Sequence, residues 1–184
     1  MNTQELFERA KEDLLADGKH APVMYVEYVD GGQDKLDFFY FANFGAETPL
    51  EERKQFFALG MKWGREQNGH VDFTALTFIS EAWTSSVAPG TKPAWKRPHE
   101  DPNRREALIA QIVTFMPTPD GRQEMKQTFL RAEIVRPSPD VVDLVSDLSE
   151  AHVTRLLFPG YFLAGYSASQ CSPAELAQIF RDIV

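Results

Sequence analysis

Strand-like segments joined by tight turns constrain this 184-residue chain more than any other feature of its sequence. The first predicted hairpin joins residues 23–29 to 36–42 through Asp-Gly-Gly, and the second joins 106–115 to 123–135 through Pro-Thr-Pro-Asp-Gly. The strand segments are rich in β-branched and aromatic side chains, and the connecting residues favour turns. Because a hairpin makes its two strands antiparallel, the sequence predicts two antiparallel pairs.

Residues 71–83 predict a fifth strand, long and central, with both faces apolar. The alternation of side chains assigns one set to each face. One face is predicted to carry Phe73, Ala75, Thr77 and Ile79, and the other Leu76, Phe78 and Ala82.

Helical signals surround these strands. Residues 3–16 place Leu6, Phe7, Ala10 and Leu14 on one face before Gly18, and Thr48-Pro49-Leu50-Glu51 reads as a capped start of a helix that reaches residue 67. Two further helices are predicted, one opened by Ser138-Pro139-Asp140 and carrying Val141, Val142, Leu144, Val145 and Leu148, the other opened by Ser172-Pro173. The predicted fold is therefore α+β, with a single mainly antiparallel sheet of about five strands covered by helices.

The apolar segment from Leu156 to Tyr166 is left open between two interpretations. It is either a buried strand or an exposed apolar segment that pairs with a second copy of the chain, which would make a homodimer. Pro159 and Gly160 interrupt it, and it is shorter than the roughly 20 apolar residues that span a bilayer.

Composition predicts one globular domain covering residues 1–184 in a reducing, cytoplasmic compartment. The single cysteine, Cys171, excludes an intramolecular disulfide, and the acidic N-terminal segment lacks the pattern of a signal peptide. A net charge of −8 disfavours binding to nucleic acids and membranes. No cofactor is expected, because the chain has no nucleotide-binding or metal-spacing motif.

The long proline-rich segment 84–103 is the strongest candidate for function. Long irregular segments inside a compact domain are commonly functional, and its prolines restrict the conformations it can adopt. It is locally basic within an acidic chain. The side chains predicted to form a binding site here and on its flanks are Glu81, Trp83, Trp95, His99, Asp101 and Arg104.

Glu81 follows a strongly apolar stretch of the central strand, which permits two interpretations. A buried carboxylate needs a partner or a raised pKa, and both occur often at functional sites. The structural alternative places Glu81 at the rim of the sheet in an ion pair with Arg104 or Arg105.

A metal-assisted hydrolase is the enzymatic alternative, with Glu81, His99 and Asp101 as metal ligands beside Glu100. The spacing argues against it, because no His-x3-His or His-Glu-x2-His pattern is present.

A nuclease-like arrangement built on Glu124 and Lys126 is excluded by the second hairpin. Its turn sets Glu106 opposite Ala132, about 26 Å along the strand from Glu124. The same register predicts two cross-strand ion pairs, Arg105 with Glu133 and Glu106 with Arg131.

Nucleic-acid or phosphate binding is the second alternative. The basic side chains of residues 92–105 would contact phosphates, and Trp83 and Trp95 would stack on bases. The acidic remainder of the chain argues against it.

The motif Glu81-Ala82-Trp83, followed by Glu100-Asp101-Pro102-Asn103-Arg104-Arg105-Glu106-Ala107-Leu108, resembles small uncharacterised proteins of bacteria and phages. The resemblance covers roughly residues 20–115. That group has no assigned activity, so the resemblance implies only that this loop matters. The favoured interpretation is a non-enzymatic binding domain for a protein or small-molecule partner, which uses the rim between Glu81 and Glu106.

Overall fold

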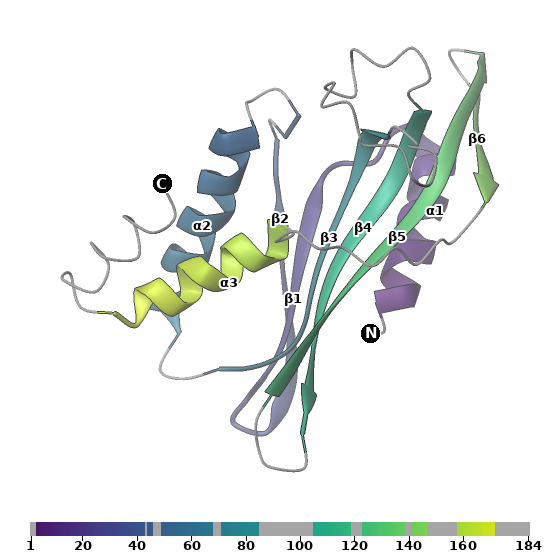
Figure 1. Ribbon diagram of the computed structural model, residues 1–184. Coiled ribbons are helices and arrows are strands. Elements are labelled where there is room, and N and C mark those ends of the chain that lie inside the picture. The colour runs from purple at the N-terminus through teal and green to yellow at the C-terminus, as the bar shows by residue number, and fades with distance from the viewer. Residues whose placement is uncertain are drawn as a thin grey trace, which may run out of the picture.

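The computed structural model describes residues 3–42, 44–45, 49–67, 71–84, 105–118, 123–138, 141–146 and 158–171. These residues form one six-stranded antiparallel sheet, ordered β2-β1-β3-β4-β5-β6, and three helices (Figure 1). The α+β class and the single antiparallel sheet are confirmed, whereas the predicted number of strands is one too few. The strands are β1 (Val23–Asp30), β2 (Gln33–Tyr40), β3 (Asp72–Thr84), β4 (Arg105–Pro117), β5 (Gln123–Ser138) and β6 (Val141–Ser146); the helices are α1 (Thr3–Asp17), α2 (Pro49–Glu66) and α3 (Phe158–Ser169).

Both predicted hairpins are present. Asp30 pairs with Gln33 around Gly31 and Gly32, whose φ angles of 58° and 78° require a left-handed backbone that glycine adopts without strain. The second hairpin pairs β4 with β5 from Pro117 and Gln123 outward. Since β3 pairs with both β1 and β4, the two hairpins belong to one sheet.

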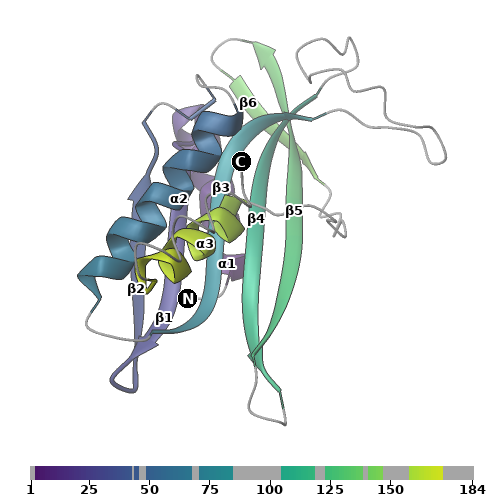
Figure 2. The same cartoon turned by 60° about the vertical axis from the view of Figure 1, so that its left-hand side comes forward.

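Helices cover both faces of a curled sheet. Figures 1 and 2 show α1 on one face, beneath β6, and α2 with α3 on the other. The apolar side chains divide accordingly into two cores. The α1-side core includes Leu6, Phe7, Ala10, Leu14, Val23, Ile79, Leu108, Ala110, Ile112, Leu130, Ala132 and Ile134, which confirms the predicted inner face of the first helix. The α2/α3-side core includes Met24, Val26, Tyr28, Phe56, Trp63, Val71, Phe73, Leu76, Phe78, Val113, Phe162 and Tyr166.

One side chain of the central strand lies on the opposite face from the one predicted. The pairing of β1 with β3 shifts by one residue between Glu27–Ala75 and Tyr28–Phe73. This β-bulge reverses the alternation, so Phe73 joins the α2/α3-side core while Ile79 lies in the α1-side core.

The predicted helix at 141–148 is wrong where it is described, because Val141–Ser146 form strand β6. β6 pairs with β5 after an irregularity between Val135 and Ser138. Val142 and Leu144 pack against the α1-side core while Val141 is half exposed, which is the two-residue period of a strand. A short run rich in valine fits the period of a helix as well as that of a strand. Residues 141–146 form a strand because β5 offers them backbone groups to pair with. The predicted final helix lies outside the described residues.

Residues 158–166 belong to helix α3, which makes the predicted buried strand wrong and leaves the pairing with a second copy as a prediction. Pro159 is tolerated there, since the first turn of a helix does not use its N–H groups. Gly60 and Gly165 let α2 and α3 touch: a Cβ on Gly60 would lie 1.9 Å from the Phe162 carbonyl oxygen, and one on Gly165 would lie 2.0 Å from that of Phe57. Within the described ranges, no helix is long and apolar enough to span a membrane.

Candidate functional site

The candidate rim lies where β3 ends and β4 begins. Glu81 is paired with Leu108 and Trp83 with Glu106, which places both glutamates and Trp83 on the face that α1 covers. Glu81 and Glu106 are each 21% exposed at the side chain, whereas Trp83 is 49% exposed. We call Glu81, Trp83 and Glu106 the rim residues.

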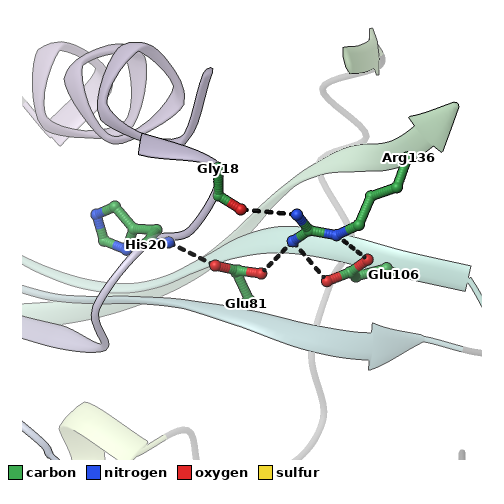
Figure 3. Close-up of polar contacts among 5 residues, drawn as sticks. All are labelled: Gly18, His20, Glu81, Glu106 and Arg136. Carbon is green, nitrogen blue, oxygen red and sulfur yellow. Dashed lines mark hydrogen bonds and ion pairs between the residues drawn. The ribbon is translucent and has the colours of Figure 1, made fainter. Parts of the chain in front are cut away.

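Arg136 of β5 joins the two glutamates through its guanidinium group (Figure 3). Its Nε and Nη2 each donate a hydrogen bond of 2.9 Å to Glu106, one to each carboxylate oxygen. Nη2 also donates to Glu81 Oε2 at 2.9 Å. A planar guanidinium group matches a carboxylate in this paired geometry, so the three side chains hold one another in fixed positions. We call Glu81, Glu106 and Arg136 the ion cluster.

The ion cluster also fastens the segment between α1 and β1 to the sheet. Arg136 Nη1 donates a hydrogen bond of 2.7 Å to the carbonyl oxygen of Gly18, at the end of α1. The backbone N–H of His20 donates to Glu81 Oε1 (Figure 3). The cluster therefore satisfies backbone groups that follow a helix end, where internal partners run out.

The two glutamates have opposite pKa shifts. Burial raises the pKa of Glu81 above its ordinary value, and the hydrogen bond from the His20 backbone and the charge of Arg136 only partly oppose this. Hydrogen bonds from Arg136 lower the pKa of Glu106. Burial also lowers the pKa of the His20 imidazole, whose Nδ1 is buried without a hydrogen-bond partner among the described residues. At neutral pH the guanidinium of Arg136 is shared by two carboxyl groups, of which Glu106 holds its charge more strongly.

The geometry leaves the acids of the rim little capacity for other chemistry. Both carboxylate oxygens of Glu81 already accept hydrogen bonds, and both oxygens of Glu106 accept from Arg136. Across the residues the structure describes, no group of three or more His, Cys, Asp or Glu side chains could hold a metal ion. Trp83 is the rim residue whose side chain offers a large surface to another molecule.

Of the six predicted site residues, the structure describes Glu81 and Trp83, and it brings them to the same face of the sheet. Glu81 lies at the rim in an ion pair with an arginine, as the structural interpretation expected, but that arginine is Arg136. Trp95, His99, Asp101 and Arg104 lie outside the described residues.

The two predicted cross-strand ion pairs had different outcomes. Arg105 Nη1 lies 2.8 and 3.0 Å from the two carboxylate oxygens of Glu133, which confirms that pair. The pair between Glu106 and Arg131 is wrong, because Glu106 binds Arg136. The hairpin register is shifted by two residues from the predicted one, since Ala107 lies opposite Glu133. The nuclease-like arrangement remains excluded, because Glu124 lies opposite Met116, far along β4 from Glu106.

Arg136 is the residue that sequence reasoning missed. The predicted strand ended at Val135, and the predicted turn closed between Pro117 and Gly121, whereas Pro117 pairs with Gln123. Arg136 therefore had no position in the predicted sheet. The signal that could have found it is the strand-like pattern that continues from 123 to Ser138, in which Pro137 falls at the irregularity in the pairing of β5 with β6. Extending β5 in this way places Arg136 beside the start of β4, where Glu106 lies.

A second concave feature lies between α3 and the sheet. A groove of about 240 Å³ is lined by Val113, Met125, Gln127, Gly160, Leu163, Ala164 and Ser167. Its lining is almost wholly apolar. It contains none of the rim residues, so it is not part of the predicted site.

Comparison with known proteins identifies no relative. No family model, no curated protein and no solved structure matches this chain.

Proposed function

We propose that this chain is a non-enzymatic binding domain whose contact surface is the rim residues. The observation that supports this most strongly is the half-exposed Trp83 beside the ion cluster. Tryptophan is among the residues that contribute most to binding at protein interfaces, because its large ring buries much area at little entropic cost. The ion cluster gives that ring a rigid base, since Arg136 fixes three segments of the chain at once.

The alternative of a metal-assisted hydrolase at Glu81, His99 and Asp101 is less favoured. Glu81 would have to release both Arg136 and the N–H of His20 before its oxygens could bind a metal ion. Elemental mass spectrometry of the purified protein separates the two proposals. We expect no stoichiometric Zn or Mn; a bound ion that disappears in His99→Ala or Asp101→Ala would overturn the binding-domain proposal.

Nucleic-acid binding is also less favoured, because Arg105 already pairs with both carboxylate oxygens of Glu133. Titration of a single-stranded oligonucleotide at low salt tests it. Affinity that falls steeply with salt and is lost in an Arg104→Ala, Arg105→Ala variant would favour nucleic acid over the proposed class of partner.

The rim is tested directly by selecting peptides from a random library for binding to the native protein. We expect the peptides that emerge to contact Trp83, so Trp83→Ala should weaken them by about 2 kcal/mol, or about 30-fold. Met125→Ala is the matched control, because Met125 is exposed to the same 49% but lies in the apolar groove. Peptides that bind Trp83→Ala as tightly as the native chain, or that are lost only in Met125→Ala, would contradict the proposal.

A further inference from the structure

Strand β2 ends the sheet on one side, and its outward backbone groups can be identified from the hairpin register. Gln33 pairs with Asp30 across the tight turn, and the Phe41 N–H donates to the Pro22 carbonyl oxygen at 3.0 Å. In an antiparallel ladder, pairs that exchange hydrogen bonds alternate with pairs that do not. The N–H and C=O groups of Asp34, Leu36, Phe38 and Tyr40 therefore point away from β1, toward the side on which the described residues place no further strand.

The same residues carry apolar side chains that are exposed. Leu36, Phe38 and Tyr40 are 38%, 57% and 66% exposed and lie in a row on the α1-side face of β2. The main contacts of α1 with the sheet fall on β3, β4 and β6, none of which neighbours β2. An edge strand with unpaired backbone groups and exposed apolar side chains is a template for pairing with another strand.

We propose that β2 pairs antiparallel with β2 of a second copy of this chain, about a twofold axis that passes through Leu36. This register sets Leu36 opposite its own counterpart and sets Asp34 opposite the partner's Phe38. Each of these pairs joins outward-pointing backbone groups and can exchange two hydrogen bonds. The Leu36 and Phe38 side chains of both copies then form one apolar patch across the junction, within diagonal reach of one another.

Charge complementarity favours a second copy over an unrelated strand. The register sets Lys35 opposite the partner's Asp37, and Asp37 opposite the partner's Lys35, in the pairs whose side chains approach most closely. Two opposite-charge pairs thus form from one strand sequence, as a symmetric interface requires.

On its α2 side, β2 borders a hollow that can hold Lys35 of the second copy. A hollow of about 300 Å³ is lined by Leu36, Asp37, Phe38, Phe39, Trp63, Glu66 and Gln67. Trp63 Nε1 and the Tyr28 hydroxyl donate to Asp37 Oδ2 at 2.8 and 3.2 Å, which fixes that carboxylate at the hollow. Asp37 and Glu66 make the hollow acidic, so it is suited to the lysine that the register delivers. In the single chain, Lys35 instead pairs with Asp30 on the exposed hairpin.

Sedimentation velocity over a concentration series tests the proposal. We expect a reversible dimer that Leu36→Pro abolishes, because proline removes an outward N–H while leaving the β1–β2 hydrogen bonds intact. Lys35→Glu should weaken the dimer at least tenfold, because it sets two acids opposite one another. Lys54→Glu, the same charge change at an exposed position on α2, should leave it unchanged. A chain that is monomeric throughout, or a dimer that these two β2 variants do not affect, would overturn the proposal.

The register is tested by cysteine cross-linking in a Cys171→Ser background, which removes the single native thiol. Opposed residues in a hydrogen-bonded antiparallel pair have Cα atoms about 5.5 Å apart, within reach of a disulfide. Leu36→Cys should form a covalent dimer under mild oxidation and Tyr40→Cys should not. Cross-linking at Tyr40 with none at Leu36 would refute the twofold axis at Leu36.

Discussion

Replacing Arg136 by alanine should destabilise the fold, because its guanidinium group is shared by two carboxyl groups and holds the end of α1. The substitution removes two hydrogen bonds to Glu106, one to Glu81 and one to the carbonyl of Gly18. It leaves the two acids close together without a cation. Breaking a buried ion pair costs about 3–5 kcal/mol, and an exposed pair contributes about 0.2–1 kcal/mol. Arg136 is 31% exposed and each acid 21%, so we expect an intermediate loss of about 2 kcal/mol.

Urea denaturation followed by circular dichroism measures this loss. For a chain of this size, 2 kcal/mol corresponds to a fall of about 4–8 °C in Tm. Arg105→Ala is the control: it removes an arginine that also contacts both carboxylate oxygens of a glutamate, through Nη1 alone, but Arg105 is 60% exposed. We expect that control to cost less than about 1 kcal/mol.

A double-mutant cycle separates repulsion between the acids from lost packing. Glu106→Gln added to Arg136→Ala should recover part of the stability, because it removes one of the two uncompensated charges. If Arg136→Ala costs no more than Arg105→Ala, the ion cluster does not fasten α1 to the sheet and the argument fails.

Three further changes test other parts of the structure. Glu106→Gln should lower the free energy of unfolding at pH 7 by about 1 kcal/mol. Because the pKa of Glu106 lies below its ordinary 4.5, this difference from the native chain should be constant above pH 4.5 and should disappear as the pH falls through the folded-state pKa. A series of unfolding curves from pH 7 to 3 checks this, and a deficit independent of pH would contradict it. Burial raises the pKa of Glu27, whose Oε1 is buried without a partner among the described residues. The native chain therefore loses stability as the pH rises through that raised pKa. Glu27→Gln should be more stable than the native chain by about 0.5 kcal/mol at pH 7 and equally stable below pH 4.5. Gly165→Ala should lower Tm by several degrees although alanine favours helices, because its Cβ would collide with the Phe57 carbonyl, and an unchanged or raised Tm would show that α2 and α3 do not touch there.

The elements that sequence predicts well here are those with local signals. The Asp-Gly-Gly turn specifies its hairpin because glycine adopts the left-handed backbone angles at both positions without strain. The inner face of α1 follows directly from the spacing of Leu6, Phe7, Ala10 and Leu14. In these cases, residues close in sequence determine the structure.

The elements that sequence fails to predict are decided by distant partners. Residues 141–146 join the sheet because β5 offers them an edge, and the bulge in β3 beside Glu27 turns Phe73 to the other face. Neither event has a signal within its own segment. The close contact of α2 with α3 likewise becomes visible only when Gly60 and Gly165 are seen to face one another's backbone.

The second hairpin forms with a register shifted by two residues from the predicted one, which preserves some of the predictions and not others. Because side chains alternate along a strand, an even shift keeps every residue on its predicted face and changes only which residues lie opposite. Glu106 therefore shares its face with Ala132 and Ile134 in both registers, and so with Arg136, whereas Arg131 lies on the opposite face. Arg105 still reached Glu133, because a diagonal neighbour lies within the length of an arginine side chain. The face of a strand thus survives an error in the turn, whereas the identity of an ion pair, and any chemistry that depends on it, does not.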